Sequence, residues 1–337
     1  MRTVTVSAEN GSYDIRIGPG LLDDWEPPQE YAVISDENVM HFYSGKFPAA
    51  RCAAILPPGE SSKNMQQLER ILDALVEMDI SRKGTLIAFG GGVIGDIAGF
   101  AAACFKRGID FIQIPTTLLA QVDSSVGGKV AVDLRGGKNL AGAFLQPKAV
   151  LIDTNTLRTL PAREFAAGMA EVIKYGYIAD RGFHDRLSRE TVPDEDIVET
   201  CCRIKARYVD EDPFDHGIRA QLNYGHTIGH ALETAAGYGE YLHGEAVGIG
   251  MIYAAAMGEK LGVSPCGLRE DTVRLLQKYN LPTEADPEVL RAGLSFLTHD
   301  KKAAGSSLDL VLIDTIGHAV VVKLPVAEIQ KMMEELI

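Results

Sequence analysis

Short apolar runs rich in β-branched residues alternate with helical or glycine-containing segments along the first half of the chain. Each run is bounded by turn residues, a pattern that predicts buried strands. The clearest runs lie at residues 3–6, 31–35, 84–89, 110–114 and 149–153. Because these runs alternate with helical segments, they predict an α/β layer with a largely parallel sheet.

The pattern changes near residue 160. From there to about residue 278, alanine- and leucine-rich segments carry apolar positions at helical spacing. A later apolar run at 308–313 and the run that begins at His318 flank Gly317, which predicts a small hairpin before a final helix. We therefore predict a Rossmann-like α/β nucleotide-binding domain over residues 1–155 and a mainly helical, all-α C-terminal domain over residues 156–337.

Composition describes an ordinary globular protein. The 337 residues are 46% hydrophobic, which is enough for two domains with substantial cores. The N-terminus has no apolar signal region and no run of 18 apolar residues occurs, so we expect neither secretion nor membrane insertion and place the protein in the cytoplasm. The five cysteines form no CxxC pair, which favours reduced thiols.

The formal charge of −13 argues against nucleic acid as a partner, because surfaces that bind phosphodiester backbones are usually basic. It leaves room for a small anionic substrate. Lysines and arginines punctuate the glycine-rich segments, so we expect a locally basic cleft in an acidic protein.

Gly90-Gly-Gly-Val-Ile-Gly-Asp96 follows the apolar run 84–89 and opens an apolar helical segment that ends near Phe105. Glycines let the backbone approach a phosphate, and a helix N-terminus supplies free N–H groups, so the segment suits a dinucleotide pyrophosphate. No acidic residue follows about 20 residues later, as it does in a simple Rossmann fold. Asp36, at an earlier strand end, offers an alternative ribose contact, which leaves a different strand order open.

Two glycine-lysine elements, Gly127-Gly-Lys129 and Gly136-Gly-Lys138, resemble phosphate loops only in part. Valine and asparagine follow the lysines, so neither completes the GxxxxGK[ST] motif, and we do not expect an NTPase. Each element by itself is equally consistent with a tight turn that carries a solvated lysine. Two of them close together favour an anion-binding site.

Three of the eight histidines, His226, His230 and His243, lie close together among glycines. If residues 219–230 form one helix, Arg219, Asn223 and the first two histidines share a face. Glu171 adds a carboxylate from a helical segment in which it shares a face with Lys174. Two histidines and a carboxylate with one open position are the usual ligands of a catalytic zinc ion, whereas the HExxH spacing of metalloproteases is absent.

Taken together, these segments resemble the 3-dehydroquinate synthase family of sugar-phosphate cyclases. The resemblance runs in consistent order from Asp36 to Lys302. It implies a nucleotide-binding α/β domain, a helical domain that binds metal and substrate, and an active site in the cleft between them. It also implies a homodimer, because a family arginine that matches Arg107 reaches substrate phosphate across the subunit interface.

The resemblance assigns zinc, with cobalt as an alternative, to Glu171, His226 and His243, which revises the simple pairing of His226 with His230. It makes His230 a candidate for proton transfer. The residues that it implies for NAD are Asp36, Asn38, Glu60, Lys63, Gly92, Val93, Ile94, Gly95, Asp96, Thr116, Thr117, Lys129, Lys138, Thr156, Leu157, Arg158 and Thr159. Those that it implies for substrate are Arg107, Asp123, Lys129, Asn139, Lys174, Lys205, Arg219, Asn223, His230, Lys301 and Lys302.

The implied reaction converts a phosphorylated sugar acid, 3-deoxy-D-arabino-heptulosonate 7-phosphate, to 3-dehydroquinate and inorganic phosphate. Its stages are transient oxidation by NAD, β-elimination of phosphate, reduction and aldol closure. Two positions depart from the family: Pro58 replaces a frequent aspartate, and Asp215 a frequent glutamate. The alternatives are a related cyclase with another carbocyclic product, a metal-dependent alcohol or glycerol dehydrogenase, and a non-catalytic protein that senses NAD or stores metal.

Overall fold

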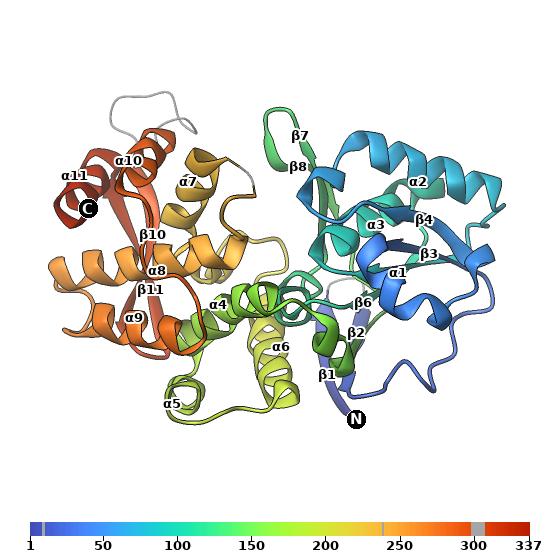
Figure 1. Ribbon diagram of the computed structural model, residues 1–337, viewed down its shortest axis with the longest axis horizontal. Coiled ribbons are helices and arrows are strands. Elements are labelled where there is room, and N and C mark those ends of the chain that lie inside the picture. Colours follow the sequence, from blue (N-terminus) through green and yellow to red (C-terminus); the bar gives the residue numbers. More distant parts are fainter. Residues whose placement is uncertain (9–10, 238, 298–306) are drawn as a thin grey trace. The chain divides into compact units, whose positions relative to one another are not determined.

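The computed structural model describes residues 1–8, 11–237, 239–297 and 307–337 and divides into two compact units (Figure 1). Unit 1 consists of Met1–Pro161 and Asp194–Phe214, and unit 2 consists of Ala162–Pro193 and Asp215–Ile337. This division differs from the single boundary expected after residue 155. Unit 1 continues to Pro161 and also takes a helix from the second half of the sequence.

Unit 1 is built on a seven-stranded sheet with the order β1-β2-β9-β6-β5-β3-β4. Its strands are β1 (Arg2–Ala8), β2 (Gly11–Gly18), β3 (Tyr31–Asp36), β4 (Cys52–Leu56), β5 (Thr85–Gly90), β6 (Asp110–Pro115) and β9 (Ala149–Asp153). Only β1 and β2 pair antiparallel within this sheet. The predicted largely parallel sheet and its five strands are confirmed, whereas β2 and β4 were not predicted.

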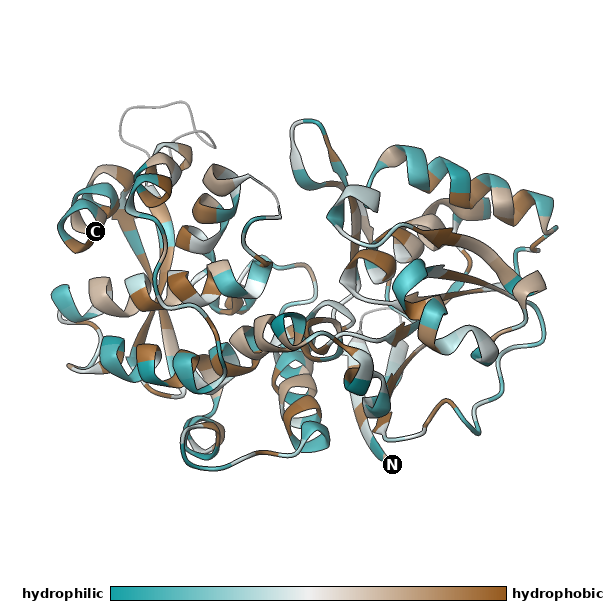
Figure 2. Ribbon diagram, in the orientation of Figure 1, coloured by the Kyte–Doolittle hydropathy of each residue, from teal (hydrophilic) through white to brown (hydrophobic). Residues whose placement is uncertain are grey.

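Helices cover both faces of this sheet, which explains why its central strands are apolar throughout. Every residue of β3 and of β5 is buried. Ala32 and Ile34 belong to one core, with α2 (Met65–Glu77) and α3 (Gly92–Cys104), while Tyr31 and Val33 belong to a second core with α1 (Glu37–Tyr43). Successive residues of a strand thus pack into the two cores on opposite faces of the sheet. The amphipathic helix α2 appears in Figure 2 as alternating teal and brown residues.

The strand order places a switch point beside β3. The chain goes from β3 outward to β4 and then returns to place β5 on the other side of β3. In open α/β sheets, ligands bind outside the carboxyl ends of the strands at such a point. The different strand order left open by the sequence is therefore the one observed, and Asp36 and Gly90 end the two strands that flank the switch.

A hairpin and a helix complete unit 1. The strands β7 (Lys129–Leu134) and β8 (Gly137–Phe144) form an antiparallel hairpin that contains both glycine-lysine elements. The helix α6 (Asp194–Glu211) contacts β1 and β2 through its buried face. Arg2 in β1 forms ion pairs at 2.7 Å with both Asp196 and Glu199, which ties this helix to the sheet of unit 1.

Unit 2 is mainly helical. Its helices are α4 (Ala162–Ala179), α5 (Arg181–Arg189), α7 (His226–Ala236), α8 (His243–Lys260), α9 (Leu268–Lys278), α10 (Pro287–Phe296) and α11 (Val326–Leu336). α8 is buried along most of its length and contacts α4, α7 and α9. The predicted hairpin around Gly317 is confirmed as β10 (Ser307–Thr315) and β11 (His318–Pro325), and the predicted final helix is α11.

Helices α7 and α8 approach each other closely enough to require glycine. A Cβ added to Gly250 would lie 2.0 Å from the carbonyl oxygen of Gly225, so that no larger residue fits without a shift of the backbone.

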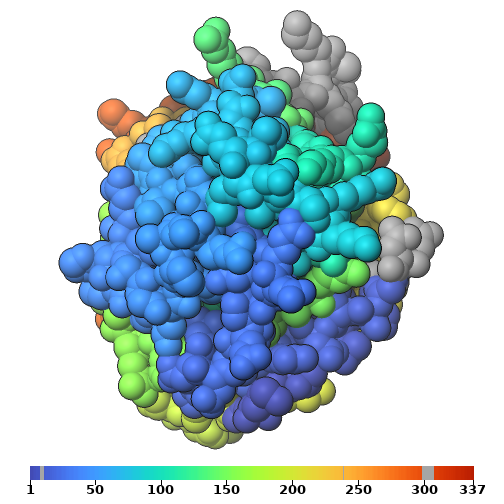
Figure 3. All heavy atoms as spheres, turned by 90° about the vertical axis from the view of Figure 1, so that its right-hand side faces the viewer, coloured from blue at the N-terminus to red at the C-terminus, as the bar shows by residue number. Residues whose placement is uncertain are grey.

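Among the described helices, none has both the length and the hydrophobicity needed to cross a membrane. Figure 3 shows one face of unit 1, covered mainly by blue and cyan segments from the N-terminal third of the chain.

Candidate active site

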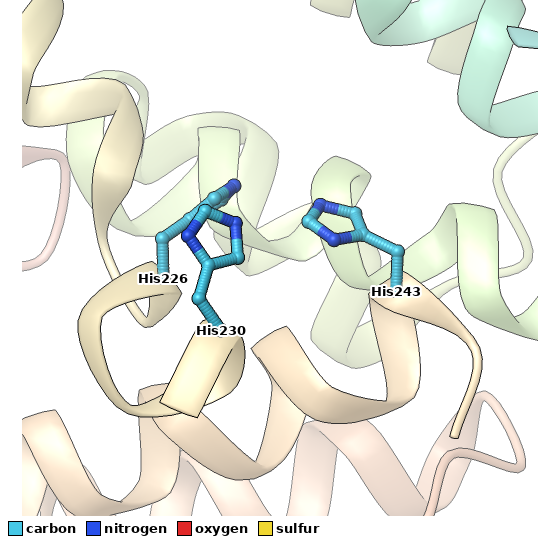
Figure 4. A group of neighbouring side chains, drawn as sticks. All are labelled: His226, His230 and His243. Atoms are coloured by element: carbon cyan, nitrogen blue, oxygen red, sulfur yellow. The ribbon is translucent and has the colours of Figure 1, made fainter. Parts of the chain in front are cut away.

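Three helices of unit 2 contribute to one polar cluster. α4 supplies Glu171 and Lys174, α7 supplies His226 and His230, and α8 begins with His243. The nitrogen ligand atoms of the three histidines lie within 4.8 Å of one another. Figure 4 shows the three rings turned toward a common space above the start of α8.

The carboxylate of Glu171 faces two of these histidines. Its Oε1 lies 3.5 Å from Nε2 of His226 and 3.4 Å from Nε2 of His243. Its other oxygen, Oε2, forms an ion pair with Lys174, and the whole side chain is buried. Atoms that bind a tetrahedral zinc ion at about 2.0–2.1 Å are themselves roughly 3.3 Å apart. The observed separations therefore fit a zinc ion held by Glu171, His226 and His243.

The protonation states of the cluster suit this role. Burial lowers the pKa of His226 to about 3, so its ring is neutral at pH 7. Burial acts in the same direction on His243, but hydrogen bonds with Glu171 and Glu233 outweigh it and raise its pKa to about 10. Metal binding at His243 would therefore displace a proton.

Lys174 stabilises the negative charge of Glu171. The two side chains are buried one helical turn apart and form an ion pair. Burial by itself raises the pKa of Glu171, but the charges of Lys174 and His243 hold it well below 4.5. The carboxylate is thus ionised throughout the neutral range and available as a ligand.

The prediction of a single helix over residues 219–230 is wrong. A 3₁₀ helix, Ile218–Asn223, carries Arg219 and Asn223, and α7 begins only at His226. Between them, Tyr224 ends the first helix, and Gly225, with a φ of 83°, precedes α7 in a left-handed conformation that lets this helix start against α8. Arg219 and Asn223 therefore do not share a helical face with the histidines.

Most of the residues implied for NAD lie just after the carboxyl ends of strands in the main sheet of unit 1. Asp36 ends β3 and caps α1 by accepting a hydrogen bond from the Val39 N–H at 3.0 Å. Gly91 is the N-cap of α3 and has no side chain that could cap the helix, so the first N–H groups of α3 are available to a phosphate. A Cβ on Gly95 would lie 2.8 Å from Oε1 of Gln113, so this glycine lets α3 pack close to β6.

The remaining residues of this group lie after neighbouring strands. Thr116 follows β6, and its N–H donates to the carbonyl of Gly90 at 3.0 Å. Thr156, Leu157, Arg158 and Thr159 lie in the 3₁₀ helix after β9. Lys63 forms an ion pair with Asp96 at 2.6 Å and a longer one with Glu60 at 3.8 Å. Burial raises the pKa of Asp96 to about 6 against the opposing charge of Lys63.

Unit 1 also joins two residues implied for substrate that are far apart in the sequence. The ammonium group of Lys205 in α6 lies 2.7 Å from Oδ1 of Asp123 and donates to its carbonyl at 2.6 Å. Asn139, in β8, has a φ of 57°, and its N–H donates to Asp133 at 2.8 Å. Lys129 and Lys138 belong to the same hairpin.

Arg107 is exposed on a tight turn after α3. Lys106, Arg107 and Gly108 all have positive φ values, at 48°, 65° and 111°. Such a conformation is unfavourable for residues with a side chain. Lys301 and Lys302, also implied for substrate, lie outside the described residues.

Comparison with known proteins matches this arrangement to one family. The N-terminal model of 3-dehydroquinate synthase matches residues 53–167, and the C-terminal model of the same family matches residues 168–303. The chain belongs to the 3-dehydroquinate synthase family. A family member from Neisseria gonorrhoeae is 46% identical over an alignment of 345 positions, which includes 96% of this chain and 96% of that one.

Solved structures of related cyclases share the fold over nearly the whole chain. One is a 2-deoxy-scyllo-inosose synthase complexed with carbaglucose-6-phosphate, NAD+ and Co2+, at 27% identity and a TM-score of 0.85, with 99% of both chains covered. Another is a 2-epi-5-epi-valiolone synthase from Streptomyces hygroscopicus with NAD+ and Zn2+, at 26% identity and a TM-score of 0.84, with 100% of this chain and 99% of that one covered. The predicted Rossmann-like, dehydroquinate synthase-like fold is confirmed.

The buried pair of Glu171 and Lys174 gives a test of the electrostatics without added metal. Glu171→Gln should lower the free energy of unfolding of the metal-free protein by about 3–5 kcal/mol, because it leaves the Lys174 ammonium buried without its counter-charge. Urea titration at pH 7 measures the change. The double variant Glu171→Gln/Lys174→Met is the control, and it should recover part of the loss.

The same variant has an expected pH dependence. The pKa of Glu171 is depressed in the folded protein, so its contribution is present above its unfolded value near 4.5 and is lost as the pH falls below it. The difference between the wild type and Glu171→Gln should therefore shrink in acid. A difference below about 0.5 kcal/mol at pH 7 would contradict the assigned ion pair.

Proposed function

We propose that this protein is a 3-dehydroquinate synthase that converts 3-deoxy-D-arabino-heptulosonate 7-phosphate to 3-dehydroquinate and inorganic phosphate. The observation that carries the proposal is the full-length match to this family at 46% identity. The convergence of Glu171, His226 and His243 supports it independently, because this reaction needs a metal-ligand set with an open position.

We propose NAD as the dinucleotide and zinc, with cobalt as an alternative, as the metal. When bound, the metal would lower the pKa of a coordinated substrate hydroxyl, and NAD would accept a hydride and later return it. Glu171, His226 and His243 would hold the metal. The open N-terminus of α3 and the carboxyl ends of β3 and β6 would hold the dinucleotide.

The chain supplies cations rather than an obvious base for the elimination step. Lys205 is anchored by Asp123, and Lys174 by Glu171, so both ammonium groups keep fixed positions. We assign these lysines, with Arg219 and Asn223, to substrate groups that gain negative charge as the phosphate departs. The departing phosphate is itself a base, so a protein base is not required. We assign proton transfer at the other steps of the reaction to His230.

We propose further that the protein acts in the cytoplasm as a homodimer in which Arg107 of each subunit contacts the phosphate of substrate bound to the other. The strained turn of positive φ values at Arg107 supports this, because strain of this kind persists where it presents a functional side chain.

The first test is turnover with limiting cofactor. Zinc-loaded protein should convert the heptulosonate phosphate with NAD present below the concentration of substrate, and phosphate and dehydroquinate should appear in equal amounts over many turnovers per NAD. No release of phosphate by the folded, zinc-loaded protein would point to a cyclase that acts on another substrate. NADH that accumulates in step with product would identify a dehydrogenase.

Mutation should distinguish the roles of the metal ligands from the role of the proposed proton-transfer residue. His243→Ala should lose bound zinc and turnover together, because the Nε2 that faces Glu171 is removed. His230→Ala should keep its zinc and lower kcat by about 100-fold or more, as expected when a general acid or base is removed. Metal content by atomic emission and steady-state kinetics provide the two readouts. Equal loss of zinc from both variants would refute this division of roles.

Arg107→Ala tests the homodimer. The variant should remain a dimer in sedimentation while its KM for the phosphorylated substrate rises by about tenfold or more, because a charge-assisted contact to phosphate contributes about 1.5–3 kcal/mol. Lys83→Ala, at another exposed cation of unit 1, is the control. If Arg107 acts across the interface, mixed dimers of Arg107→Ala and His243→Ala should regain activity in one of their two sites. No recovery on mixing would contradict action across the interface.

A further inference from the structure

Both ring nitrogens of His243 face a carboxylate. Nε2 lies 3.4 Å from Oε1 of Glu171, and Nδ1 lies 3.2 Å from Oε2 of Glu233. An ionised carboxylate can only accept a hydrogen bond, so Nδ1 must carry the proton in the contact with Glu233. The nitrogen available to a metal is therefore Nε2. Once Nε2 has lost its proton, its lone pair points at Glu171.

The ring of His226 has the same arrangement with a different acceptor. Its Nδ1 lies 3.2 Å from the carbonyl oxygen of Tyr224, and its Nε2 lies 3.5 Å from Oε1 of Glu171. A backbone carbonyl also only accepts, so this ring too carries its proton on Nδ1. Both histidines thus present Nε2 to the same carboxylate oxygen. One is oriented by the backbone, and the other depends on the side chain of Glu233.

The position of Glu233 is set by the packing of α7 on α8. It lies seven residues after His226 and three after His230, on the same face of α7, and it is only 7% exposed. A Cβ on Gly229 would lie 3.0 Å from the backbone of Ala246 in α8, so the two helices are in near-backbone contact there. The backbone that carries Glu233 is therefore fixed relative to the start of α8, where its carboxylate contacts His243.

The start of α8 is held from its other side as well. Glu245 accepts the N–H of Leu242 at 2.9 Å and receives two hydrogen bonds from Arg163 in α4, at 2.7 and 2.8 Å. A Cβ on Gly244 would lie 1.8 Å from the carbonyl oxygen of Ala167, so α4 and α8 also touch through their backbones. These contacts fix the backbone position of His243. Its ring can still rotate, and the contact with Glu233 is what restricts that rotation.

We propose that Glu233 is a positioning residue that holds the ring of His243 with Nε2 toward Glu171 and thereby sets the metal affinity of the site. The inference rests on the proposed function, in which His243 is a metal ligand. Carboxylates that accept the second N–H of a ligating histidine fix its tautomer and its orientation, and their loss typically weakens metal binding by about 10–100-fold.

The test measures zinc affinity on the full-length protein by competition with a chromogenic chelator. Glu233→Ala should raise the Kd for zinc by about 10–100-fold. Glu233→Gln keeps an acceptor oxygen of the same reach, and it should restore most of the affinity, to within about tenfold of the wild type. Glu288→Ala removes an exposed carboxylate elsewhere in unit 2 and should leave the Kd unchanged.

The outcomes separate this inference from the proposed function. If the wild type binds zinc and turns over but Glu233→Ala and Glu233→Gln both keep its Kd within about twofold, the role of Glu233 is wrong and the function stands. If the wild type neither binds zinc nor turns over, the proposed function fails first. Equal loss of affinity in the alanine and glutamine variants would also overturn the hydrogen-bond role, because glutamine retains the acceptor.

A second measurement needs no variant and so does not depend on folding. Nitrogen NMR of the zinc-loaded wild type, labelled at histidine, reads which ring nitrogen binds the metal. We expect Nε2 of His243 to be the ligand and Nδ1 to carry a proton. Metal on Nδ1 would overturn the proposal directly.

Discussion

The burial of one carboxylate is the constraint around which unit 2 is organised. Glu171 is fully buried, and an isolated ion at such a position would cost several kcal/mol. Lys174 supplies the opposite charge from the same helix, and His226 and His243 approach from two others. Three helices must therefore meet at one point, and the glycines at their crossings let them do so.

In unit 1, the groups available to a charged ligand are arranged differently. Its candidate nucleotide site depends mainly on the backbone: parallel strands that end at one edge, a switch in strand order, and a helix whose first N–H groups are open. The side chains there form pairs rather than a cluster, as with Lys63 and Asp96 or Lys205 and Asp123. A backbone site suits a large dinucleotide, whereas a cluster of side chains suits a small ion.

The sequence prediction failed at several places, each for its own reason. β2 alternates buried and exposed positions clearly but is short of apolar residues, and β4 is a short run with little β-branching. The single helix expected over 219–230 ignored Gly225, whose left-handed conformation depends on the contact of α7 with α8. Glu233 was not singled out, although its spacing from His226 and His230 on one helix was a signal that could have identified it.

The sequence by itself determined the central strands, the helical character of the second half and the membership of the family. These follow from the local spacing of hydrophobic residues and from the order of the motifs, and both can be read directly along the sequence. Only the tertiary structure decided that α6 belongs with the sheet of unit 1, and that Lys205 meets Asp123. It also decided which ring nitrogen of His226 and of His243 faces Glu171. Such contacts join residues distant in sequence, and their geometry depends on how helices pack, which no local pattern specifies.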